Sequence, residues 1–67
     1  MKYYVYTKTD KQGDHEVHRE GCNRMPLDEN RVTLGDFTSC QSAVKEAKRR
    51  GYSADGCRWC SSECHTS

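Results

Sequence analysis

The chain has 67 residues, of which 33% are hydrophobic and 31% are charged. This length gives one small domain, covering residues 1–67, and the composition excludes a fold held by its hydrophobic core alone. The formal net charge of +1 gives the molecule no overall attraction to nucleic acid or membrane, so such a partner would need a local patch. A metal or disulfide staple is therefore expected, and the five cysteines could supply either.

The choice between these staples depends on the compartment. The N-terminal segment lacks the apolar stretch of a signal peptide, and no apolar run approaches the about 20 residues that span a bilayer. Five cysteines is also an odd number, so a set of disulfides would leave one thiol unpaired. These observations favour a cytoplasmic protein whose thiolates bind metal rather than one held by disulfides.

The N-terminal half predicts strands. Aromatic and β-branched residues over 2–7 predict the first strand, and a turn over 10–14 leads to a short returning strand over 15–18. A third short strand is expected over 29–34. Together they predict a two- or three-stranded antiparallel sheet.

One helix is predicted at about 39–50. Its apolar stripe consists of Cys40, Ala43, Val44 and Ala47. Thr38 or Ser39 can cap the start, and Thr38 with Gln41 fits the capping-box pattern. Gly51 is the expected residue just beyond the helix end. Residues 53–67 show no periodicity and predict a ligand-bearing loop and tail, so the fold class is small α+β.

Two pairs of metal-ligand residues stand far apart in the sequence. His18 and Cys22 form the first pair, and Cys57-x-x-Cys60 forms the second. Two thiolate- or imidazole-bearing pairs match the ligand arrangement of a closed tetrahedral zinc site. Such a site can contribute on the order of 10 kcal/mol to folding. The alternative for His18 is a histidine on a strand surface with no metal role.

A series of residues around these pairs has a familiar order. It comprises His18-Arg-Glu-Gly-Cys22, Glu29-Asn-Arg-Val32, Phe37-x-Ser39, Ala43, Ala47, Gly51-Tyr52 and Cys57-x-x-Cys60. Over about residues 15–60 the chain resembles the Ada-type metal-binding domain family, with a longer helix and extra residues between Tyr52 and Cys57. The resemblance implies zinc held by His18, Cys22, Cys57 and Cys60, and nucleic acid as a partner class.

One position departs from that family in a way that bears on chemistry. In the family's methylphosphotriester repair protein, the first ligand is a cysteine that accepts the methyl group. His18 stands at this position and cannot act as a thiolate acceptor. The resemblance therefore implies the fold and the zinc without the repair chemistry.

Three residues have no place in the family pattern: Cys40, Cys64 and His65. Each is an alternative metal ligand, and Cys64 or His65 could replace His18. Cys40 is favoured as a small apolar side chain on the helix stripe, although the helix start can lower a thiol pKa. A disulfide or redox pair between Cys40 and Cys64 is a further alternative.

A candidate nucleic-acid surface combines cations with an aromatic side chain. Its members are Lys45, Lys48, Arg49, Arg50, Arg58 and Trp59. Cations beside an exposed aromatic suit a nucleic-acid backbone and its bases. The positive charge of this surface is reduced by three acidic residues, Glu46, Asp55 and Glu63. We therefore favour the alternative, a solvated helix face with Trp59 buried.

The function expected from the sequence is that of a non-enzymatic, monomeric zinc-binding module. It would interact with nucleic acid or another protein and have no membrane role. The alternative is a thiol-based redox or metal-handling protein that uses Cys40 and Cys64. A catalytic role is disfavoured because the sequence offers no activated nucleophile–base pair.

Overall fold

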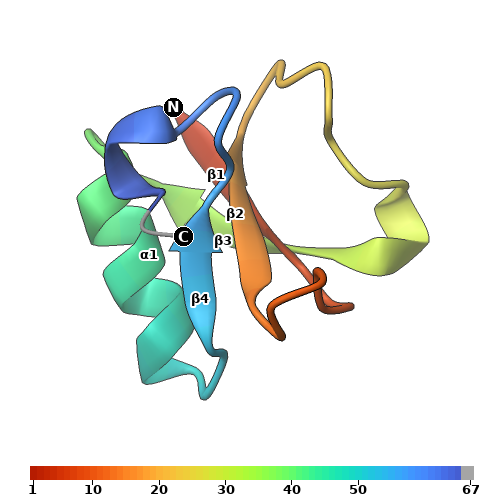
Figure 1. Ribbon diagram of the computed structural model, residues 1–67. Coiled ribbons are helices and arrows are strands. Elements are labelled where there is room, and N and C mark those ends of the chain that lie inside the picture. Colours follow the sequence, from red (N-terminus) through yellow and green to blue (C-terminus); the bar gives the residue numbers. More distant parts are fainter. Residues whose placement is uncertain (66–67) are drawn as a thin grey trace.

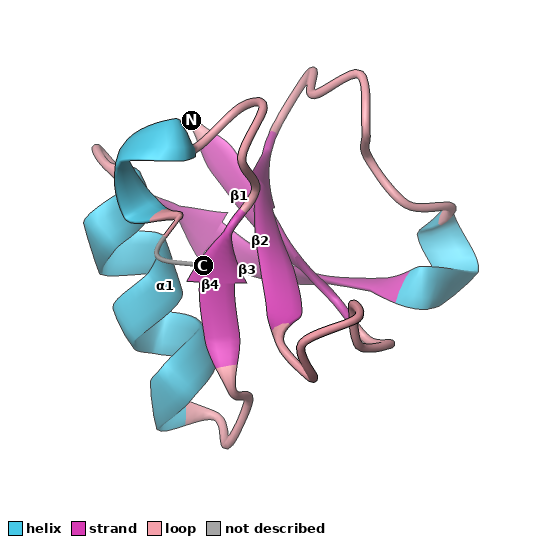
Figure 2. Cartoon of the chain, in the orientation of Figure 1, coloured by secondary structure: helices cyan, strands magenta, loops and turns pink. Residues whose placement is uncertain are grey.

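A computed structural model describes residues 1–65, which form one sheet with one helix against it (Figure 1, Figure 2). The strands are β1 (Lys2–Tyr6), β2 (His15–Arg19), β3 (Arg31–Asp36) and β4 (Ala54–Gly56). The helix is α1 (Cys40–Arg49), and two short 3-10 turns are η1 (Asp28–Asn30) and η2 (Ser62–Cys64). The long segment between β2 and η1 bows away from the sheet on the side opposite α1 (Figure 1).

The sheet has four strands in the order β3-β1-β2-β4. β1 pairs antiparallel with β2 and β3, whereas β4 pairs parallel with β2. The prediction of a two- or three-stranded antiparallel sheet was therefore wrong. It missed β4, whose three residues are too few to show the alternation that identifies a strand. The predicted tail beyond His65 lies outside the described residues.

The third strand is shifted from its predicted position. β3 covers residues 31–36, and the start of the predicted 29–34 strand lies in η1 instead. Gly35, the residue after the predicted 29–34 strand, lies inside β3 with φ +123°. The pairing with β1 slips at this point, because Tyr3 lies opposite Gly35 and Tyr4 opposite Thr33. A positive-φ glycine is typical of such a bulge.

The core lies between the sheet and one face of α1. Tyr3 and Val5 of β1 are buried, and Val17 of β2 lies opposite Val5 on the same side of the sheet. The other buried members are Leu34, Cys40, Ala43, Ala47, Ala54 and Cys64. Val44 is partly buried against them, so the predicted helix stripe is confirmed. Five of these nine side chains are alanine or cysteine, which makes the apolar core small.

Both ends of α1 carry recognisable caps. Ser39 is the N-cap, and its side chain accepts a hydrogen bond from the Ser42 N–H at 3.4 Å. The cap is thus one of the two predicted residues, and the Thr38–Gln41 box does not provide it. At the other end Gly51 has φ +101°, its N–H bonds the Lys48 carbonyl, and the chain closes as a Schellman motif.

No helix within residues 1–65 is both long and apolar enough to cross a membrane.

Candidate metal centre

The parallel pairing of β2 and β4 places two of the predicted ligands side by side. In the register of these strands Val17 lies opposite Gly56. The next residues along the two strands are His18 and Cys57, and the Cys57 N–H donates to the Val17 carbonyl at 2.9 Å. The carboxyl ends of parallel strands point to the same edge of a sheet. The strand that the sequence did not predict is therefore the one that builds the site.

Two tight turns supply the other two ligands. After β2, the Cys22 N–H bonds the Arg19 carbonyl at 3.0 Å, and Gly21 within this turn has φ +85°. After β4, the Ser61 N–H bonds the Cys57 carbonyl at 2.8 Å, which closes a turn around Cys60. Each turn brings a second cysteine back toward the strand end from which it started.

The four predicted ligands come together: His18, Cys22, Cys57 and Cys60. Their ligand atoms all lie within 4.8 Å of one another. The Cys22 sulfur lies 3.9 Å from the Cys57 sulfur and 3.6 Å from Nδ1 of His18. Around a tetrahedral zinc ion, Zn–S and Zn–N bond lengths give edges of about 3.8 Å between sulfurs and about 3.6 Å between sulfur and nitrogen. The cluster thus has the dimensions of a metal-binding site.

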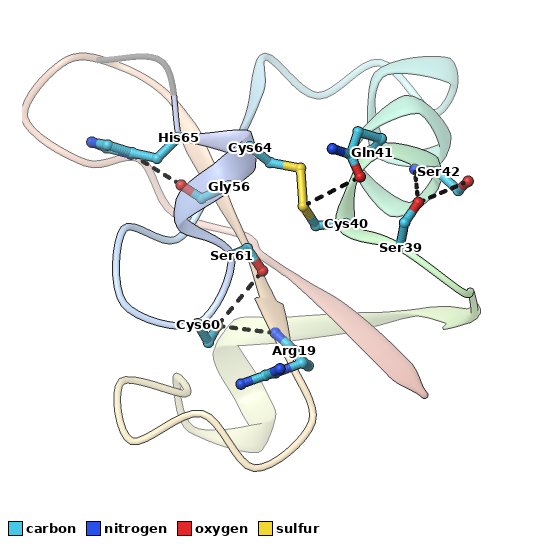
Figure 3. Close-up of a disulfide and its surroundings, with 10 residues drawn as sticks. All are labelled: Arg19, Ser39, Cys40, Gln41, Ser42, Gly56, Cys60, Ser61, Cys64 and His65. Atoms are coloured by element: carbon cyan, nitrogen blue, oxygen red, sulfur yellow. Dashed lines mark hydrogen bonds between the residues drawn. A yellow bond between two sulfur atoms is a disulfide. The ribbon is translucent and has the colours of Figure 1, made fainter.

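Each cysteine sulfur also accepts a backbone N–H. Arg24 donates to Cys22 and Trp59 to Cys57, both at 3.4 Å and both from two residues farther along the chain. The N–H of Arg19 donates to Cys60 at 3.2 Å (Figure 3). Such donors stabilise thiolates and orient them, as the outer shell of a metal site does.

The pKa values of the three free thiols are shifted in different directions. Burial, with a hydrogen bond to Cys60, raises the pKa of Cys22 to about 12, and burial raises the pKa of Cys57. Burial would also raise the pKa of Cys60, but the Arg19 N–H and neighbouring hydrogen bonds lower it overall. Cys60 is therefore the most acidic of the three thiols, and a bound cation would favour the thiolate form of all three.

His18 is held in the form that binds a metal. It is 1% exposed, and burial lowers its pKa to about 4, so the ring is neutral at pH 7. Nδ1 faces Cys22, whereas Nε2 lies 3.3 Å from a carboxylate oxygen of Glu16. A carboxylate on the far nitrogen fixes the ring of a metal-binding histidine. Sequence reasoning missed Glu16, although its position two residues before His18 puts both on one strand face.

The two remaining cysteines form a disulfide. Cys40, at the start of α1, is bonded to Cys64 in η2, with their Cα atoms 6.2 Å apart (Figure 3). The preference for metal over disulfides does not hold for all five cysteines. Cys22, Cys57 and Cys60 are free, whereas the Cys40–Cys64 disulfide that was given as an alternative is present. The five cysteines thus divide into three free thiols and one disulfide. Cys40 and Cys64 are thus not available as the alternative ligands.

His65 has a bracing role beside the site. Its Nδ1 lies 3.0 Å from the Gly56 carbonyl and 3.2 Å from Asp55, outside the four-ligand cluster (Figure 3). A Cβ on Gly56 would lie 2.6 Å from the Cys64 Cβ, so η2 packs directly on β4. The disulfide and His65 together hold the chain on both sides of Cys57.

The predicted basic surface divides into two parts. On α1, Arg49 and Arg50 both bond Glu46 at 2.7 Å, and these hydrogen bonds lower the pKa of Glu46 to about 2. Lys45 and Lys48 line a hollow that also contains acidic residues. This part of the surface is therefore largely neutralised.

The second part of that surface lies at the metal centre. Trp59 is 63% exposed, so the favoured expectation of a buried tryptophan was wrong. The guanidinium carbon of Arg58 lies 5.8 Å from the centre of its ring, and that of Arg24 lies 4.6 Å away. Arg24 was not predicted. Its signal was available, since it follows Cys22 by two residues as Trp59 follows Cys57.

Comparison with protein-family models, curated proteins and solved structures found no match for this chain. The resemblance to the Ada-type family stays a prediction.

Proposed function

We propose that this chain is a non-enzymatic zinc-binding module whose metal staples a small fold and supports an interaction surface. The observation that carries the proposal is the convergence of four ligand atoms within 4.8 Å, contributed by two distant segments of the chain. A site built from both halves of a sequence can hold those halves together only when the metal is bound.

Zinc is the metal that best suits this donor set. Three thiolates and one imidazole form a common structural zinc site, and soft sulfur donors disfavour magnesium and calcium. Four protein donors fill a tetrahedral shell and leave no position for a substrate or reactive water. This closed shell supports a structural role rather than a catalytic one. The predicted Ada-type resemblance agrees with such a site, and His18 in the acceptor position agrees with the absence of alkyl transfer.

The proposal is tested by measuring metal content and folding together. Native mass spectrometry of the wild-type chain should give one zinc per molecule, and Cys22→Ser should lose zinc and the dispersed amide spectrum of a folded protein. The matched control is the double variant Cys40→Ser/Cys64→Ser, which also removes sulfur but keeps the four ligands. It should retain one zinc. A wild-type chain that is folded with all three free thiols alkylated would contradict the proposal.

The disulfide supports a second candidate function, which is thiol-based redox activity or metal handling through Cys40 and Cys64. A dithiol reductant would transfer two electrons and two protons to the disulfide, giving two thiols, and would itself become oxidised. Against this function, Cys40 is 2% exposed and Cys64 9%, whereas reactive cysteines are accessible. Differential alkylation along a dithiol series decides it: reversible reduction with zinc retained favours the redox function, and reduction only on unfolding favours a staple.

A further inference from the structure

We propose that the surface formed by Trp59, Arg24 and Arg58 binds single-stranded nucleic acid, with a base stacked on the indole and phosphates on the guanidiniums. This surface is called the Trp59 surface below. The inference rests on the proposed function, because the turns that carry Arg24 and Trp59 begin at the ligands Cys22 and Cys57 and donate N–H bonds to them.

Trp59 is exposed, although burying it would stabilise this small core. The sequence has a single tryptophan, and the core is built largely from small side chains. Burying an indole would give such a core more apolar contact than any other residue could. The side chain instead remains 63% exposed, while its own backbone N–H is tied to the Cys57 sulfur. The hydrogen bond to Cys57 thus fixes the backbone of Trp59 at a position where its ring is exposed.

Arg24 and Arg58 differ from three of the other arginines in their ion pairs. Arg31 is paired with Asp28, and both Arg49 and Arg50 are paired with Glu46. Within residues 1–65, Arg24 and Arg58 make no ion pair with a carboxylate, and both lie over the Trp59 ring. Two uncompensated cations therefore gather at the one exposed tryptophan. Their charge is complementary to a polyanion.

A single strand satisfies both parts of this surface. Its phosphates pair with guanidiniums, and its unpaired bases offer π-faces that stack on aromatic side chains without sequence preference. In a duplex the base faces are covered by their neighbours, so only the phosphate contacts would remain. An inorganic polyanion or an anionic membrane likewise offers charge without a base to stack. The combination of an open indole with two cations is thus best matched by single-stranded DNA or RNA.

The test uses the zinc-loaded full chain with (dT)12 and (rU)12 as probes. Trp59 is the sole tryptophan, so base stacking should quench the intrinsic fluorescence in a saturable way. The logarithm of the binding constant should fall with the logarithm of salt concentration, with a slope of about −0.7 per phosphate contact. The DNA and RNA probes are compared directly to identify the preferred strand. A double-stranded 12-mer should bind more weakly than either.

Variants assign the binding to this surface, read out by anisotropy of a labelled (dT)12. Trp59→Ala should weaken binding by about tenfold or more, and Trp59→Phe should keep most of it. Arg24→Ala should reduce the magnitude of the salt slope by about 0.7. Arg49→Ala is the matched control, because it removes the same charge from α1 and leaves the Trp59 surface intact. Equal losses for Arg24→Ala and Arg49→Ala, or full binding by Trp59→Ala, would overturn the inference.

Zinc content is measured in every sample, so that the two proposals fail separately. Zinc-loaded protein that binds neither probe overturns the nucleic-acid inference and leaves the zinc site intact. A folded chain that holds no zinc but still quenches with (dT)12 overturns the proposed function and its support of this surface. Polyphosphate or anionic vesicles that bind as tightly as (dT)12 also overturn the inference, since stacking would then add nothing.

Discussion

The two faces of the sheet are covered in different ways. On one face, α1 packs its apolar stripe against Tyr3, Val5 and Val17, and the disulfide joins its first residue to η2. On the other face, His18 is buried beneath a segment that contains only the short turn η1 between β2 and β3. The first face depends on side-chain packing and a covalent bond. The second has little apolar material, so we infer that its order depends on the metal.

Metal removal should separate the two faces most sharply. Chelation with the disulfide intact should withdraw on the order of 10 kcal/mol of metal-binding free energy from the folded state. We expect the segment over 20–30 and the turn over 57–60 to lose hydrogen-exchange protection first, because their order depends on the four ligands. The amides of α1, which the disulfide holds against the sheet, are the comparison and should lose protection later. Unchanged protection over 20–30 after chelation would show that packing alone orders that segment.

The disulfide should make a smaller contribution on the helix face. Cys40 and Cys64 are separated by 24 positions, and closing a loop of this length is worth about 3 kcal/mol in the chain-entropy description. Urea unfolding of the zinc-loaded Cys40→Ser/Cys64→Ser variant measures the loss. Its zinc stoichiometry should remain at one. A variant that also releases zinc would show that the two staples are not independent.

Gly56 tests how closely η2 must pack on β4. In Gly56→Ala the new Cβ would lie 2.6 Å from the Cys64 Cβ and 2.7 Å from the Ser61 carbonyl oxygen. Such overpacking costs about 2 kcal/mol, which thermal unfolding would detect. Gly13→Ala is the comparison, since Gly13 has φ +84° but nothing within 4 Å of the added Cβ. Its cost should be about 1 kcal/mol and purely conformational. Equal costs for the two variants would contradict the close packing.

Of the four changes considered, Glu16→Gln should have the smallest effect. Glu16→Gln keeps the side-chain shape but removes the charge beside Nε2 of His18, and outer-shell changes of this kind weaken metal affinity by about tenfold. Competition with a chromophoric zinc chelator measures the change. Glu29→Gln is the matched control, because Glu29 lies in η1 rather than beside the histidine. A global melting temperature that falls without a change in zinc affinity would argue against a positioning role.

The contrast between the faces also explains what the sequence could predict. The stripe on α1 and the Gly51 cap were predictable because helical periodicity and a positive-φ glycine are local signals. The pairing of His18 and Cys22 with Cys57 and Cys60 was predictable because ligand chemistry restricts the choices. These residues required no knowledge of the strand register that joins them.

The missed features depend on contacts between distant segments. β4 is a three-residue strand that pairs with β2, and no local sequence pattern predicts that pairing. The disulfide was weighed and not favoured, because the argument from compartment treated metal and disulfide as exclusive. In the structure the disulfide and the four-ligand cluster lie on different faces of one sheet. The compartment itself stays a prediction.

The parallel register of β2 and β4 also sets an order of assembly. Cys22 and Cys57 are 35 positions apart, yet their sulfurs lie 3.9 Å from each other. During synthesis the first ligand pair must therefore wait until β3, α1 and β4 have been made. Closing so long a loop is entropically unfavourable until β3 has paired with β1 and α1 has formed within it. A metal held by all four residues could complete its coordination only after Cys60 has been made, so we expect metal capture to accompany the last step of folding.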